Sequence, residues 1–329
     1  MKRGKYTILV LVITVSIIVF LLLNLLLGSV SIPFASVWNI LTGGEGDPAA
    51  WQNIILKSRL PQALTALVAG AGLSISGLQM QTIFRNPLAG PSVLGISSGA
   101  SLGVAFVVLL SGQLGGVALS RLGFIGEVAL SIAAVVGALS VMGLIVLASR
   151  KVVGSVTLLI IGVMIGYIAN AVIGVLKFFS VEEDIKAYVI WGLGSFARVS
   201  GNQMMLFVTI MAVIIPLSFL LIKPLNLLML GDGYARNLGL NINRARVWVI
   251  TCAGVLTAIV TAYCGPIIFL GLAVPHLCRA IFQTSDHRVL MPTAMLVGAS
   301  LALLCNLIAR LPGFEGALPV NSVTALVGA

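Results

Sequence analysis

Residues 59–103 read RLPQALTALVAGAGLSISGLQMQTIFRNPLAGPSVLGISSGASLG, and this stretch decides the fold class of the chain. No charged side chain occurs from Leu60 to Phe84. A run of this kind is long enough for a membrane-spanning helix, which needs about 20 apolar residues. The run also contains small residues, which let a neighbouring backbone approach closely; they are Gly70, Gly72, Ser74, Ser76 and Gly77.

The tripeptide Arg85-Asn86-Pro87 ends this predicted helix, because proline disfavours helix at the preceding residue and lacks an N–H. A second uncharged run follows, interrupted by Pro91 and by several glycines. Broken backbone at membrane depth is tolerated only where protein or a water-filled cavity surrounds it. The pattern therefore favours the wall of a transport path, with tight packing in a structural bundle as the alternative.

Composition points to the same class. The chain has 329 residues, of which 59% are hydrophobic and only 9% are charged, whereas a soluble domain carries about 25% charged residues. The net charge of +10 does not indicate nucleic-acid binding, because the basic residues separate apolar runs and do not form one face. We therefore predict an all-α polytopic membrane protein.

The apolar runs predict about ten membrane spans and one short helix near 182–191. With the N-terminus inside, the inner side receives twelve of the nineteen basic residues and two of the nine acidic ones, as the positive-inside rule requires. The first run is too long for a signal peptide, so we expect an uncleaved span. The predicted spans are 8–28, 60–82, 92–111, 124–148, 155–176, 203–222, 247–264, 266–283, 290–308 and a tenth from about 319.

Side chains that would carry out catalysis are sparse. The four cysteines lie in or beside apolar runs and form no C-x-x-C pair, so we expect small buried hydrophobes. Of the two histidines, His276 follows Pro275 in an apolar run and has no second ligand at helical spacing, which favours a hydrogen-bonded packing histidine over a metal ligand. A phosphate-binding G-x-x-x-x-G-K-[ST] loop is also missing from the sequence.

The sparse acids bear on the energy source. No acidic pair lies inside a predicted span, which disfavours a self-contained secondary transporter or channel. A purely structural membrane scaffold would not need the broken helices at 86–103. We therefore expect that a partner supplies the energy for transport and that this chain is no enzyme.

Several segments resemble the FecCD family of ABC importer permeases. They are the opening stretch with its continuation NPLAGPSVLGISSGASLG, GPIIFLGLAVPHLCRAIF at 265–282, and LPVNSVTALVGA at 318–329. The resemblance implies a type II ABC importer fold, in one transmembrane domain over 1–329. It also implies that spans two to five and seven to ten form an inverted pair, with a pathway at their interface. Family members continue to a basic tail, so the last helix is expected to be truncated here.

The resemblance also implies the cargo and the partners. The expected cargo is an iron chelate, either a siderophore or haem, with cobalamin as the alternative. The expected assembly is a homodimer in the cytoplasmic (inner) membrane of a prokaryote, with the N-terminus inside. Two ATP-binding subunits would bind on the inner side, and a substrate-binding protein on the outer side. ATP and Mg would be bound by the ATPase, and no cofactor by this chain.

Two sets of site residues follow from the resemblance. Basic residues that precede two outer span ends match docking positions for the binding protein, with a lone interfacial arginine as the alternative; they are Arg59, Arg310 and, less directly, Lys57. A cytoplasmic gate is implied at Asn86, Leu88, Ser155 and Val156.

Two further sets follow from local patterns together with the resemblance. The inner loop 223–246 has a short helical run, a glycine stop and a second run, which suits an ATPase-coupling element; a solvated loop is the alternative. Its candidate residues are Arg236, Leu238, Gly239 and Leu240. A stripe repeating every four residues in span five suits either pathway lining or close helix packing; it comprises Gly162, Gly166, Asn170 and Gly174.

Overall fold

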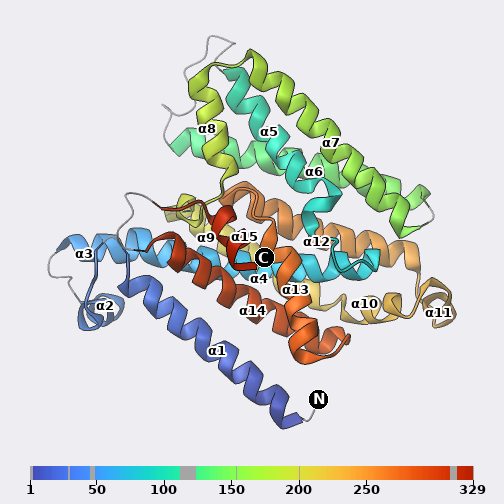
Figure 1. Cartoon of the computed structure of the whole chain (residues 1–329), viewed down its shortest axis with the longest axis horizontal. Helices are drawn as coiled ribbons and strands as arrows, with labels where there is room; N and C mark the ends of the chain where they lie inside the picture. The colour runs from blue at the N-terminus through green and yellow to red at the C-terminus, as the bar shows by residue number, and fades with distance from the viewer. Residues whose placement is uncertain are drawn as a thin grey trace.

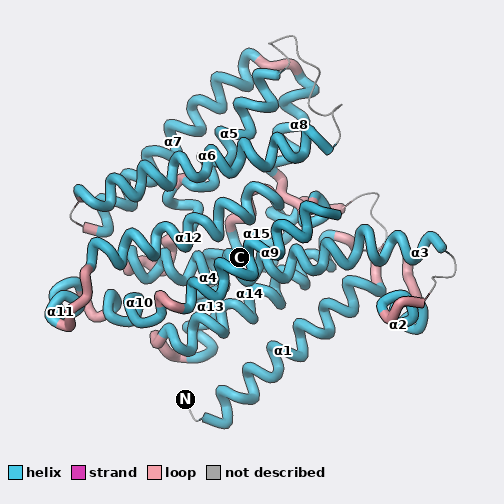
Figure 2. The backbone as a smooth tube through the Cα atoms, turned by 180° about the vertical axis from the view of Figure 1, so that it is seen from behind, coloured by secondary structure: helices cyan, strands magenta, loops and turns pink. Residues whose placement is uncertain are grey.

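The computed structural model describes residues 3–28, 30–44, 49–111, 124–152, 154–199, 201–311 and 317–328, and every regular element in these ranges is a helix (Figures 1 and 2). The α-helices of the first half are α1 (Arg3–Leu26), α2 (Phe34–Leu41), α3 (Ala49–Ile54), α4 (Leu60–Phe84), α5 (Ile96–Ser111), α6 (Phe124–Lys151) and α7 (Ser155–Phe179). Those of the second half are α8 (Glu182–Gly192), α9 (Gly201–Phe219), α10 (Ile222–Met229), α11 (Asp232–Asn237), α12 (Ile242–Cys264), α13 (Phe269–Phe282), α14 (His287–Ala309) and α15 (Val320–Gly328).

The prediction of an all-helical polytopic membrane protein is confirmed. Six helical stretches in the described part are long and apolar enough to cross a membrane, and α9 with α10 forms a further pair bent by 48°. The helices α5 and α13 are apolar but shorter, and α15 covers the start of the predicted tenth span. Each of the ten predicted spans overlaps a described helix, although only six or seven of these helices have the length and hydropathy of a full span.

Helix α4 lies at the centre, and its small residues are the reason. A Cβ added to Gly77 would lie 1.7 Å from the carbonyl oxygen of Gly271 in α13. A Cβ on Gly70 would lie 2.3 Å from the carbonyl oxygen of Gly298 in α14. The glycines thus let two helices cross α4 at backbone distance, the role that small residues have in membrane bundles.

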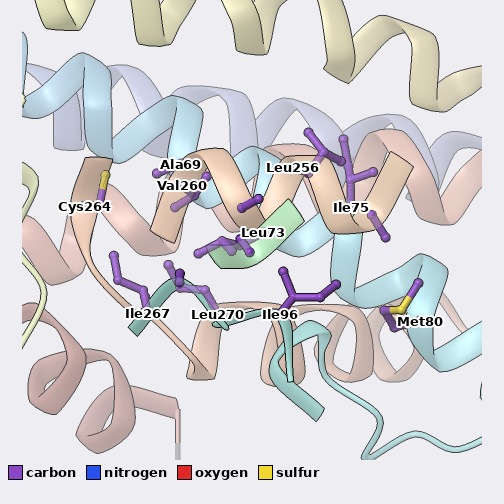
Figure 3. Close-up of a cluster of buried hydrophobic side chains, with 14 of the residues drawn as sticks. Ala69, Leu73, Ile75, Met80, Ile96, Leu256, Val260, Cys264, Ile267 and Leu270 are labelled. Carbon is purple, nitrogen blue, oxygen red and sulfur yellow. The ribbon is translucent and has the colours of Figure 1, made fainter. Parts of the chain in front are cut away.

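The apolar core lies between α4, α12 and the starts of α5 and α13. Figure 3 shows Leu73 and Ile75 of α4, Leu256 of α12, Ile96 of α5 and Leu270 of α13 in one cluster, and all five side chains are buried. Helices α5 to α8 form a separate layer, with α12 between that layer and the α4–α13–α14 group (Figure 1).

Helix α1 is held on α14 by polar contacts within the apolar spans. Asn24 donates to the carbonyl oxygen of Leu303 at 2.9 Å and accepts from Asn306 at 2.8 Å. The hydroxyls of Ser16 and Ser300 lie 2.8 Å apart. Side-chain hydrogen bonds of this kind replace the hydrophobic driving force that apolar helices lack in lipid.

Two features of the connections differ from the predicted ones. The stretch between the first two spans contains the helices α2 and α3, and α3 continues through a π-helical segment, Ile55–Arg59, into α4. In the inner loop, the predicted second short run is the first turn of α12, which begins at Ile242. Apolar spacing alone did not reveal either feature, because both depend on how the chain continues into a neighbouring helix.

Candidate functional site

Polar side chains gather at two opposite ends of the helix bundle. At the end where α1 and α14 finish and α4 begins, called the Arg59 end below, the guanidinium of Arg59 is buried, with 1% of the residue exposed. Its Nη1 donates to the carbonyl oxygens of Leu25 and Leu26 at 2.7 and 2.9 Å. Its Nη2 donates to the carbonyl oxygen of Val30. Arg59 therefore satisfies carbonyl groups that the end of α1 leaves without helical partners.

Arg310 follows α14 and lies beside Arg59. A Cβ on Gly28 would lie 3.0 Å from Nη2 of Arg59 and 3.2 Å from Nη2 of Arg310, so both guanidiniums flank the same glycine. Buried Nη1 of Arg310 has no hydrogen-bond partner among the residues that the structure describes. Burial, and then the neighbouring charge of Arg59, lower the pKa of Arg310 from its ordinary value. The two arginines therefore place two positive charges side by side at this end of the bundle.

Lys57 lies near the same end, on the π-helical segment, and its side chain is exposed. The predicted docking residues therefore differ in access: Lys57 is open, Arg310 is half-buried and Arg59 is buried. The guanidinium of Arg59 is engaged with carbonyl groups, so it is not exposed for the predicted docking. A buried arginine cannot be recognised from sequence, because its partners are backbone groups more than twenty residues away.

The opposite end, called the Arg85 end below, is organised around the last turn of α4. Gln81 accepts a hydrogen bond from Arg279 of α13 and donates to the carbonyl oxygen of Leu272 at 3.0 Å. Thr82 lies 2.8 Å from Nε2 of the buried His287, at the start of α14. The other ring nitrogen of His287 lies 2.7 Å from Oδ1 of Asn226 in α10. His287 thus joins the helices α4, α10 and α14.

Arg85 connects the end of α4 to the inner loop. It caps α4 in the left-handed conformation, with φ 47°, and donates to Asp232 at the start of α11 at 2.8 Å. Asp232 also accepts from Arg246 of α12 at 2.6 Å. One carboxylate therefore ties α11 to both α4 and α12. Sequence reasoning missed this bridge, although Asp232 is the only acid in the loop 223–246.

The helix α11 and its exit form the predicted helix–glycine–helix element. Gly239 has φ 86°, and its N–H donates to the carbonyl oxygen of Arg236 at 2.9 Å. Leu238 is 60% exposed, and so is Tyr234, at 71%, which the sequence analysis did not single out. Leu240 instead packs against the core. The exposed surface of the element thus includes the side chains of Tyr234, Arg236 and Leu238.

The predicted gate residues lie close to this end. Asn86 follows the α4 cap, and its side chain accepts from the backbone N–H of Leu88 at 2.9 Å, which fixes a tight turn. Leu88 is 71% exposed and lines a cavity of about 380 Å³ together with His276 of α13 and Val327 of α15. Val156, in the first turn of α7, is 65% exposed. The side chain of Ser155 lies outside the described part.

The small-residue stripe on α7 is buried in its first half and exposed in its second half. Gly162 packs on the segment before α5, where its Cβ would lie 2.8 Å from Cα of Leu94. A Cβ on Gly166 would lie 3.5 Å from the hydroxyl oxygen of Ser98 in α5, which is an ordinary contact distance. Asn170 and Gly174 are exposed. Close packing, one of the two alternatives from the sequence, therefore applies to Gly162 and Gly166. An exposed amide in the middle of a span needs a protein or water-lined surface opposite it.

Metal chemistry has no support in the described residues, where no group of three or more His, Cys, Asp or Glu side chains comes together. Cys264, Cys278 and Cys305 are buried free thiols, as expected for small core residues. The Arg59 end offers basic side chains, and the Arg85 end offers side-chain bridges that join α11 to α4 and α12.

Comparison with known proteins defines the class. The FecCD transport family matches residues 16–329. The vitamin B12 import system permease protein BtuC of Klebsiella pneumoniae is 36% identical over 317 residues, covering 96% of this chain and 89% of that protein. The hemin transport system permease protein HmuU of Yersinia pestis is 33% identical over 302 residues, covering 92% and 87%.

Solved structures agree with the sequence relatives. An inward-facing conformation of a metal-chelate type ABC transporter superposes with a TM-score of 0.83 at 30% identity, covering 97% of this chain and 96% of the other. PsaBC from Streptococcus pneumoniae shares the fold, with a TM-score of 0.53 at 17% identity. The fold and these relatives define a membrane permease. This chain belongs to the FecCD transport family.

Proposed function

We propose that this chain forms the translocation path of an ABC importer as a homodimer. Two ATPase subunits would bind at the Arg85 end, facing the cytoplasm, and a substrate-binding protein at the Arg59 end. The proposal is carried by the coupling element, in which an exposed helix, α11, is joined through Asp232 to α4 and α12. A docking surface tied directly to two membrane helices is suited to pass a partner's movement into the membrane.

The route from α11 to the gate is short. Asp232 contacts Arg85, and Arg85 is followed at once by the proposed gate residues Asn86 and Leu88. A displacement of α11 would therefore change the position of the α4 cap and of the turn that carries Leu88. Two discrete arrangements of such a connected element are what alternating access requires.

The ATPase partner follows from what the chain itself carries. Its sequence has no phosphate-binding loop, so ATP and Mg would be held by the partner. The homodimer is supported by α7, where the exposed Asn170 calls for a protected surface opposite it. A second copy facing α7 across a shared path would supply that surface, with Asn170 and Gly174 lining it.

The cargo that we propose is an iron chelate, a siderophore complex or haem, with cobalamin as the alternative. Support comes from the relatives, which are permeases for vitamin B12 and hemin and a transporter of the metal-chelate type. The common feature is a bulky chelate that holds its own metal, which suits a path whose described residues bring no metal-binding group of side chains together. The test is uptake of iron-loaded siderophores, haem and cobalamin by the reconstituted complex with its cognate binding protein. Uptake of cobalamin alone would exclude the iron-chelate assignment.

The gate predicts a state-dependent crosslink. Cysteines placed at Leu88 or Val156 in a chain whose own reactive cysteines have been replaced should crosslink across the dimer in one nucleotide state and not in the other. The exposed side chains at both positions leave room for the new thiols. Crosslinking yield is measured with and without ATP and vanadate. Equal yields in both states, or none in either, would remove these residues from a gate.

Docking of the binding protein predicts a salt-sensitive association. The variant with Lys57→Glu and Arg310→Glu should associate with the binding protein at least tenfold more slowly at low salt, because charge complementarity acts mainly on the association rate. The difference should shrink at high salt, since screening acts over about 8–10 Å at 0.1–0.15 M. Surface plasmon resonance on nanodiscs measures the rate.

Arg59 is left unchanged in this test because its replacement would disturb the fold. The matched control carries Lys223→Glu and Arg288→Glu, two exposed basic residues at the opposite end. A control that slows association as much as the docking variant would contradict docking at the Arg59 end.

A further inference from the structure

A cavity at the Arg85 end is lined by none of the gate residues and by no residue of α11 or its exit. It has a volume of about 380 Å³ and is lined by Arg150, Asn243, Arg244, Val247 and Trp248. Arg150 belongs to the last turn of α6, and the other four belong to the first two turns of α12. The cavity therefore lies where two membrane helices reach the same bilayer surface.

The charge in this cavity is not neutralised within the described part of the chain. Arg150 and Arg244 are exposed, and neither takes part in an ion pair there. Arg246, two residues further along α12, is different, because Asp232 holds it. Two uncompensated guanidiniums and the amide of Asn243 offer many N–H donors around one space. Guanidinium groups bind phosphate oxygens in bidentate geometry, so the chemistry selects a phosphate group.

The side chains one turn deeper are apolar and exposed. Trp248 lies one turn from Arg244 on the same face of α12 and is 60% exposed. Leu147 lies three residues before Arg150 on α6 and is also 60% exposed. Tryptophan with an exposed ring is typical of the membrane–water interface, and arginine is typical of the headgroup level. Basic side chains thus lie at the membrane surface, and an aromatic and an aliphatic side chain lie one turn further into the membrane. This order matches the headgroup and the acyl chains of a lipid that lies along the two helices.

We propose that this cavity binds the headgroup phosphate of an anionic phospholipid, whose acyl chains lie along α6 and α12 beside Leu147 and Trp248. Basic pockets between membrane helices bind anionic headgroups in this manner. Free phosphate would satisfy the arginines but would leave Trp248 and Leu147 without an apolar partner. This inference does not depend on the cargo or on the ATPase.

The test is lipid retention by the purified permease, measured by native mass spectrometry. The permease is exchanged into mixed micelles with phosphatidylglycerol or phosphatidylcholine, at equal lipid concentration. Phosphatidylglycerol should be retained preferentially. The variant with Arg150→Gln and Arg244→Gln should retain about tenfold less phosphatidylglycerol. Each basic side chain near an anionic membrane surface strengthens binding several-fold, and the variant lacks two of them. The control with Lys223→Gln and Arg288→Gln has the same loss of charge at the same end and should retain the lipid.

A second readout places the lipid. Phosphatidylglycerol with brominated acyl chains should quench tryptophan fluorescence, and Trp248→Phe should remove most of that quenching while the other three tryptophans remain.

Three results would overturn the proposal. The first is equal retention by the arginine variant and the control. The second is displacement of phosphatidylglycerol by millimolar inorganic phosphate, which would define a free-anion site. The third is loss of ATPase co-purification in the arginine variant, which would assign the surface to a protein partner.

Discussion

Gly239→Pro is expected to reduce ATP-driven uptake to the background level while the permease stays folded in the membrane. Gly239 has φ 86°, whereas proline is restricted to about −65°. The substitution also removes the N–H that donates to the carbonyl oxygen of Arg236. Both effects change the backbone directly after α11. The exposed Leu238 therefore moves away from its position beside the exposed Tyr234. Uptake into proteoliposomes and co-purification of the ATPase are the two measurements.

Matched variants separate docking from transmission. Gly233→Ala in the same helix is the control, because a Cβ there would meet nothing within 4 Å, and it should transport normally. Leu238→Asp should lose the ATPase, since it places a charge on the exposed docking surface. Asp232→Asn should keep the ATPase but lower the uptake per ATP hydrolysed, because it weakens the bridge to Arg85 and Arg246. Normal uptake by Gly239→Pro would exclude this loop from the mechanism. Leu240 is not a useful test position, because it packs against the core.

Arg59→Ala is expected to have the largest effect on stability. The substitution removes the donor groups for the carbonyl oxygens of Leu25, Leu26 and Val30. The carbonyl oxygen of Leu26 keeps the N–H of Ile32 as a donor, whereas those of Leu25 and Val30 lose the donor that Arg59 provides. Buried polar groups left without partners cost about 1–3 kcal/mol each, so the total loss is about 2 kcal/mol or more. Arg59→Lys should recover only part of this, because an ammonium lacks the planar fork that reaches several acceptors.

Three of the four cysteines are buried, so a thiol-reactive fluorophore can follow thermal unfolding in detergent. Lys57→Ala is the matched control, since it removes the same charge from an exposed side chain two residues away. The unfolding temperature should fall strongly for Arg59→Ala and hardly at all for Lys57→Ala. Equal, small shifts would show that Arg59 does not hold the end of α1.

Local signals predicted much of this fold. The uncharged run and the Asn86-Pro87 break place α4 and its end, because both act within one stretch of chain. Gly239 was recognisable as a helix stop for the same reason, since a left-handed position favours glycine. The small residues of α4 predicted close helix crossing, which the contacts of Gly70 and Gly77 confirm.

The features that were missed depend on partners distant in sequence. The burial of Arg59 is set by where α1 ends, and the bridge at Asp232 by where α4 and α12 meet α11. Gly162 and Asn170 belong to one stripe, yet one packs on the segment before α5 and the other is exposed. A repeat along one helix does not reveal which of its positions another helix covers.

ATP-dependent uptake by the complete complex tests the central proposal most directly. Proteoliposomes would contain the permease with its ATPase, and the binding protein loaded with an iron chelate would be added outside. We predict accumulation of the chelate only when ATP is enclosed, and none with a hydrolysis-deficient ATPase. Accumulation without ATP, or accumulation driven by a proton or sodium gradient, would contradict the assignment and indicate a self-contained secondary transporter.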